Sequence, residues 1–150
     1  MEGDFFISLQ QLAYSKLPPF FLGGLAAFFA WHVNRMIGSR PPARQVYIAP
    51  LAEEALKTLP AVFFSVDIFF THFFFGAAEG IWETIAVRRN GFYAGLSSLA
   101  SHSVFGCLTF LTYNFFGNPV TALAAGCLAH TAWNFTVLEF FPARKSGGRR

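Results

Sequence analysis

The sequence predicts an all-α membrane protein, a polytopic bundle of about five transmembrane helices that forms a single domain over residues 1–150. Hydrophobic residues make up 54% of the chain and charged residues only 13%, whereas soluble domains carry about 25% charged residues. The mean hydropathy is +0.44. At about 20 residues per spanning helix, the chain has room for about five spans and little else.

The N-terminal third holds the first expected span. Residues 1–16 mix apolar and polar side chains and are a candidate interfacial segment. The first span is expected at about residues 18–36, because a Pro-Pro pair suits its first turn and adjacent glycines suit close helix contact. Arg40 and Arg44 follow it, which places its C-terminal end on the cytoplasmic side and the N-terminus of the chain outside.

The apolar stretch over residues 45–87 is too long for one span. As a single helix it would extend about 65 Å at about 1.5 Å per residue, roughly twice the hydrocarbon thickness. Arginines flank both of its ends, so both ends are expected on the cytoplasmic side. We therefore predict a hairpin with a turn near Asp67 and spans of about residues 47–66 and 69–87.

Two further spans complete the expected bundle. The fourth is predicted at about residues 94–116 and the fifth at about residues 119–141, separated by a Gly-Asn-Pro turn signal. A short basic tail over residues 142–150 then places the C-terminus in the cytoplasm. Anionic lipid is the expected partner of this tail.

Charge and cysteine usage exclude other classes of protein. The pI of about 9.1 does not indicate nucleic-acid binding, because the basic residues lie at the expected helix ends, where topology requires them. Cys107 and Cys127 lie within apolar runs and match neither a zinc-binding spacing nor a disulfide framework. We expect both to be packing residues.

Four expected spans carry groups that lipid disfavours. A charge at the bilayer centre costs about 2.5–3.5 kcal/mol on insertion scales, so four lone carboxylates would cost on the order of 10 kcal/mol. Each group lies about 13–21 Å from the nearest flanking arginine, at about 1.5 Å per residue, which places them in one layer of the inner half of the membrane. The pattern predicts a polar site there, formed by Glu53, Glu54, Lys57, Glu79, His102, His130 and Asn134.

These motifs resemble those of the glutamate intramembrane protease superfamily, the PrsW-type and CAAX-protease-type (CPBP) membrane proteins. The matching segments are Glu53-Glu54-x-x-Lys57, Phe75-x-x-x-Glu79, His102 and His130-x-x-x-Asn134, in that order. The E-E-x-x-K form and the glutamate of the second motif are similar to the PrsW branch. The resemblance implies a four-helix catalytic-type core over residues 47–141 and an intramembrane endopeptidase of a prokaryotic cytoplasmic membrane.

Amide hydrolysis needs an activated water, a polarised carbonyl group and a proton for the leaving amine. We expect Glu53 to be the general base, acting through water, because a carboxylate in a low-dielectric cavity becomes a competent base near neutral pH. The resemblance implies this role for one of the first two acids, so Glu54 is the alternative. Glu79 is expected to bind the same water or to share a proton with Glu53, and Lys57 to give structural support.

The remaining polar residues are expected to complete the reaction. His130 and Asn134 would hold the developing oxyanion or position the water, and His102 would orient the water or donate a proton to the leaving group. Glu53, Glu79, His102 and His130 are also acceptable ligands for a divalent metal such as zinc. A metal-free mechanism and a metal-assisted one therefore both fit the sequence.

Three polar residues are expected to have no catalytic role. Glu83 lies close to Arg88 in the sequence and is expected to form a surface ion pair. His32 and His72 lie near the ends of expected spans and are expected at the interface.

Two functions besides proteolysis fit the same pattern. A non-catalytic scaffold, or pseudoprotease, could bind transmembrane helices without cutting them. A proton or cation carrier would also place acids and histidines inside the membrane.

Overall fold

The computed structural model describes residues 17–38, 43–86 and 90–140, and all regular elements in these ranges are helices. They are α2 (Pro19–Ile37), a π-helical turn η1 (Arg44–Ile48), α3 (Ala49–Phe63), α4 (Ile68–Ala86), α5 (Gly91–Phe116) and α6 (Pro119–Phe140). The all-α prediction is confirmed, and each expected span corresponds to one α-helix. The expectations for residues 1–16 and 142–150 lie outside the described residues.

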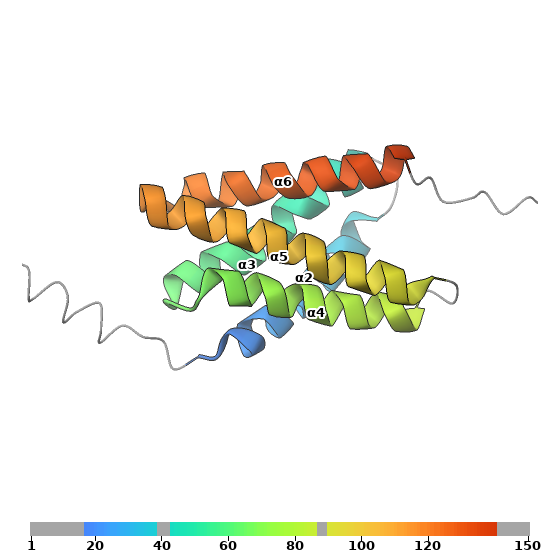
Figure 1. Ribbon diagram of the computed structural model, residues 1–150, viewed down its shortest axis with the longest axis horizontal. Coiled ribbons are helices and arrows are strands. Elements are labelled where there is room, and N and C mark those ends of the chain that lie inside the picture. Colours follow the sequence, from blue (N-terminus) through green and yellow to red (C-terminus); the bar gives the residue numbers. More distant parts are fainter. Residues whose placement is uncertain (1–16, 39–42, 87–89, 141–150) are drawn as a thin grey trace, which may run out of the picture.

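The helices form one bundle in which α4, α5 and α6 run along the long axis and α2 and α3 cross behind them (Figure 1). α5 packs against both α4 and α6, α2 packs against α3 and α4, and α3 also contacts α4 and α6. The C-terminal ends of α4 and α6 and the N-terminal end of α5 lie at the same end of the bundle. This end holds the candidate site.

The expected hairpin is present, with its turn at the expected position, but α3 is shorter than the predicted span of residues 47–66. Pro50 lies in its first turn, where a missing N–H costs nothing. Ser65 adopts a left-handed conformation with φ 54°, which ends the helical path. Asp67 then caps α4, because its Oδ1 accepts a hydrogen bond of 2.8 Å from the backbone N–H of Phe70.

Charged and polar side chains are buried inside the bundle beside its apolar core, whereas many large apolar side chains lie on its outside. α2 with 19 residues and α5 with 26 residues are long and apolar enough to cross a membrane. Large apolar side chains on the outer helix faces, among them Phe20, Phe28 and Phe115, are exposed, whereas Lys57 and Glu54 are fully buried. Soluble proteins show the opposite distribution, and this one is typical of a membrane helix bundle.

Glycines allow α4 and α5 to pack with their backbones in close approach. A β-carbon added to Gly80 would lie 2.6 Å from the carbonyl oxygen of Gly95, and one added to Gly76 would lie 2.8 Å from the β-carbon of His102. Small residues allow the backbones of membrane helices to approach one another closely. Gly76 thereby sets the distance from α4 to the His102 side chain.

We expect Gly80→Ala to reduce stability by about 1–3 kcal/mol, because the added methyl group would overlap backbone that cannot move independently. Gly24→Ala is the matched control, since a β-carbon there meets nothing within 4 Å and alanine favours a helix by up to about 1 kcal/mol. Thermal unfolding of the detergent-solubilised variants measures the difference. Equal melting temperatures for the two variants would contradict the close-packed interface.

Candidate functional site

A cavity of about 710 Å³ lies at the end of the bundle where α2, α4 and α6 end and α5 begins. Five α-helices contribute to its walls, and Trp133 belongs to the lining. The polar side chains that line the cavity are Asn34, Arg35, Gln45, Glu53, Glu79, Glu83, Ser97, Ser98, Ser101, His102, His130 and Asn134.

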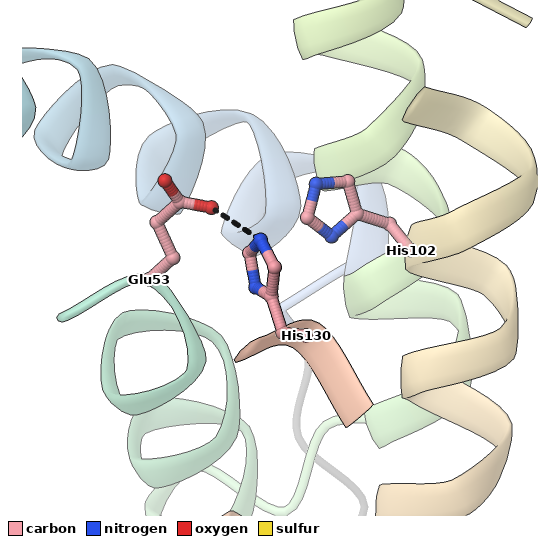
Figure 2. Close-up of side chains that lie close together, drawn as sticks. All are labelled: Glu53, His102 and His130. Atoms are coloured by element: carbon pink, nitrogen blue, oxygen red, sulfur yellow. Dashed lines mark ion pairs between the residues drawn. The ribbon is translucent and has the colours of Figure 1, made fainter. Parts of the chain in front are cut away.

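Three buried side chains from three helices converge at this cavity. Figure 2 shows Glu53 of α3, His102 of α5 and His130 of α6 pointing toward one another. One nitrogen or oxygen of each lies within 4.8 Å of the others, and His130 Nε2 lies 3.8 Å from Glu53 Oε2. The structure therefore brings together residues that are up to 77 positions apart in the sequence.

Glu79 joins this group from α4. Its Oε2 lies 2.6 Å from His102 Nε2 and accepts a hydrogen bond of 2.7 Å from Ser98 Oγ. The Glu79 side chain is 32% exposed, so it is the more accessible carboxylate of the site. Each of the four predicted helices thus delivers a polar group to the same region.

Glu54 lies next to Glu53 in the sequence but in a different environment. It is fully buried, and Lys57 Nζ donates to its Oε1 at 2.5 Å. His130 Nδ1 lies 2.9 Å from the same oxygen, and His72 Nε2 lies 2.9 Å from Oε2. Both carboxylate oxygens are therefore occupied, and Glu54 is the centre of a buried polar network.

The expected interfacial position of His72 is wrong. Its side chain is fully buried, with Nδ1 2.9 Å from the carbonyl oxygen of Ile68 and Nε2 on Glu54. His72 lies three, four and seven residues before Phe75, Gly76 and Glu79, which is the spacing of one helix face. That spacing was the available signal, and it places His72 among the site residues.

Hydrogen-bond partners define the tautomer of each site histidine. An ammonium group only donates, so His102 Nδ1, which lies 3.1 Å from Lys57 Nζ, is the acceptor and Nε2–H donates to Glu79. A carboxylate only accepts, so His130 Nδ1–H donates to Glu54. In neutral His130 the lone pair then belongs to Nε2, which faces Glu53.

Asn134 and Glu83 also line the cavity. The Asn134 Nδ2 donates to the backbone carbonyl oxygen of Gln45 at 3.0 Å, so one of its two N–H groups is occupied. Glu83 lines the cavity, whereas its expected partner Arg88 lies outside the described residues. His32 is exposed on α2, and its interfacial position stays a prediction.

Sequence reasoning also missed two polar residues that contact the site, Ser98 on Glu79 and Asn34 on Glu53. Asn34, near the end of α2, donates from Nδ2 to Glu53 Oε1 at 2.6 Å. The residue stands immediately before Arg35, where a polar side chain resembles an interfacial one.

Glu53, His102 and His130 lie close enough to share a metal ion, but His102 has partners on both of its nitrogens. Catalytic zinc sites use three protein ligands and keep one position open. Both ring nitrogens of His102 are already engaged, by Lys57 and Glu79, which leaves Glu53 and His130 as the convergent pair with free donor atoms. To serve as a metal ligand, His102 would have to lose one of these partners.

Comparisons with known proteins give no neighbour for this arrangement. No protein-family model, no curated protein and no solved structure matches the chain.

Proposed function

We propose that the protein is an intramembrane endopeptidase that hydrolyses a peptide bond of a membrane-associated peptide or protein with a glutamate-activated water. The observation that carries this proposal is the facing pair of Glu53 Oε2 and His130 Nε2, 3.8 Å apart beside the cavity. Glu53 Oε2 is buried and accepts no hydrogen bond from any residue that the structure describes. Leaving a buried acceptor without a hydrogen-bond partner costs about 1–3 kcal/mol of stability. Such an atom in a folded protein therefore calls for an explanation, such as a catalytic role or a bound water molecule.

A water molecule can complete this pair. At about 2.8 Å from both atoms, it would direct one hydrogen to Glu53 and the other to His130. Glu53 takes a proton as the water oxygen attacks the substrate carbonyl carbon. The same carboxyl group then gives this proton to the leaving amine, so one residue acts first as base and then as acid.

Neighbouring groups hold this pair and bind the substrate. Glu54 fixes the tautomer of His130 through Nδ1–H, as a carboxylate does for a catalytic histidine. Glu79, which also lines the cavity, is held by His102 and Ser98. The second N–H of the Asn134 amide is not used in the hydrogen bond to Gln45, so it can donate a hydrogen bond to the carbonyl oxygen of the substrate.

We place the cavity in the inner half of the membrane. The proposed topology has five spans, with the N-terminus outside and the C-terminus in the cytoplasm. It is supported by the arginines that flank the helices and by the apolar outer surface of the bundle. The cavity then faces the cytoplasmic side, where Arg35 and Arg44 lie.

Chelation is expected to leave the activity unchanged, because Lys57 and Glu79 occupy the nitrogens of His102 that a metal ion would need. Cleavage of a peptide substrate should proceed within twofold of the untreated rate after extended dialysis against EDTA and 1,10-phenanthroline. Loss of cleavage that returns on addition of zinc would contradict the metal-free mechanism.

The function is tested with the full-length protein in lipid nanodiscs and a panel of membrane-anchored peptides. Mass spectrometry that finds defined cleavage products supports the endopeptidase. Peptide binding without products would instead indicate a scaffold. Proton or cation flux into liposomes without cleavage would indicate a carrier, for which the chain of buried polar contacts from Glu79 through His102, Lys57 and Glu54 to His72 offers a path.

A further inference from the structure

Helix α2 lies outside the core of residues 47–141 that the sequence motifs define, yet it reaches the candidate base. Asn34 Nδ2 donates to Glu53 Oε1 at 2.6 Å, and both residues line the cavity. We propose that Asn34 is a positioning residue for the Glu53 carboxylate, so that α2 is part of the catalytic unit. The proposal rests on the proposed hydrolytic function of Glu53.

The helical spacing of α2 directs Asn34 toward the site. Leu22, Ala26 and Ala30 are buried against the bundle, and Asn34 continues the same interval of four residues. Side chains at this interval share one helix face. Asn34 therefore ends the inward stripe of α2 and does not lie on its lipid-facing side.

The chemistry of the contact fixes the orientation of the amide. An ionised carboxylate only accepts hydrogen bonds, so the nitrogen of Asn34 faces Glu53 and Oδ1 faces away. Oδ1 is buried and has no hydrogen-bond partner among the described residues. Apolar residues at positions 34 and 53 would remove both unpaired acceptors, Asn34 Oδ1 and Glu53 Oε2. Stability alone therefore does not account for the asparagine.

The hydrogen bond limits the motion of the base. With Oε1 held by α2, the Glu53 carboxylate cannot rotate freely, and Oε2 stays opposite His130 Nε2. His130 is held in turn by Glu54. A misplacement of about 1 Å at a reacting group can cost about 100-fold in rate, so loss of this restraint affects turnover more than substrate binding.

The kinetic test compares Asn34→Leu and Asn34→Asp with the wild-type protein on one cleaved peptide. Both variants lack the N–H donor, and we expect kcat to fall about 10- to 100-fold while KM stays within twofold. His32→Leu is the matched control, because His32 is exposed two residues earlier on α2. In a Glu53→Gln background, Asn34→Leu should cause no further loss, since Asn34 acts through Glu53.

A second measurement detects the contact without any hydrolysis. Solid-state NMR of the protein in bilayers, with ¹⁵N-labelled asparagine side chains and ¹³Cδ-labelled glutamate, should show a close nitrogen–carboxylate coupling. This coupling should be absent from Asn34→Leu and from Glu53→Gln. Absence of the coupling in the wild-type protein would overturn the proposal.

The stability of a double variant separates a positioning role from a structural one. Replacing both partners by apolar residues in Asn34→Leu/Glu53→Leu is expected to leave the melting temperature equal to or above that of the wild type. A lower melting temperature, or an unchanged kcat for Asn34→Leu in a wild-type protein that cleaves its peptide, would overturn the positioning role and leave the hydrolytic function standing. A wild-type protein that cleaves nothing would instead reject the hydrolytic function itself.

Discussion

Glu53→Gln is expected to abolish peptide hydrolysis, with a fall in kcat of about 1000-fold or more. The amide has nearly the shape of the carboxylate and keeps an oxygen acceptor, but it cannot take a proton from water at neutral pH. General-base catalysis contributes about 100- to 10,000-fold to a rate, and Glu53 is also expected to return the proton to the leaving amine. The initial rate of product formation in nanodiscs measures the effect.

Two controls make this result specific to the base. Glu139→Gln makes the same change at an exposed position of α6 and should keep full activity. The melting temperature of Glu53→Gln should stay within a few degrees of the wild type, because the amide oxygen can still accept the hydrogen bond from Asn34. Cleavage by Glu53→Gln at a tenth of the wild-type rate or faster would assign the base to another residue.

Lys57→Met is expected to have the largest effect on stability, a loss of about 3–5 kcal/mol. Lys57 is 0% exposed, and its Nζ contacts Glu54 Oε1 at 2.5 Å and His102 Nδ1 at 3.1 Å. The ammonium also lies 4.3 Å from the centre of the Phe75 ring. Without it, the charge of Glu54 would stay buried among neutral groups.

A second change is expected to restore much of this loss. In Lys57→Met/Glu54→Gln the carboxylate charge is removed together with the ammonium, so the double variant should be more stable than Lys57→Met alone. Arg35→Met is the matched control, because this exposed cation rests on Trp31 at 5.5 Å and should contribute no more than about 1 kcal/mol. Unfolding in graded denaturing detergent compares the variants, and equal stabilities of Lys57→Met and Arg35→Met would contradict the buried pair.

The helices could be predicted from the sequence because each is a long apolar run that ends at a turn or a basic segment. The bounds of α3 were harder to predict. Its C-terminal end depends on the left-handed conformation of Ser65, and serine has no preference that would predict this conformation. The π-helical turn of residues 44–48 precedes it and packs against α6.

The site was predictable in part, because a charge inside an apolar run is visible in the sequence. Glu53 and Glu54 could not be told apart in this way, since adjacent residues of a helix point about 100° apart and only the positions of α2, α4 and α6 decide which neighbours each one meets. Asn34 and His72 escaped notice for a related reason. Each lies near a helix end, where polar residues are common, and its inward direction becomes evident only from the face that it shares with buried neighbours.

The partners of Glu54 also have a consequence for biogenesis. Lys57 follows it by three residues, but His72 lies on α4 and His130 on α6, so the set is complete only when α6 has left the ribosome. A nascent chain with α3 and α4 alone would hold Glu54 with only part of its partners. Packing of α6 against α3 thus completes the surroundings of this buried charge.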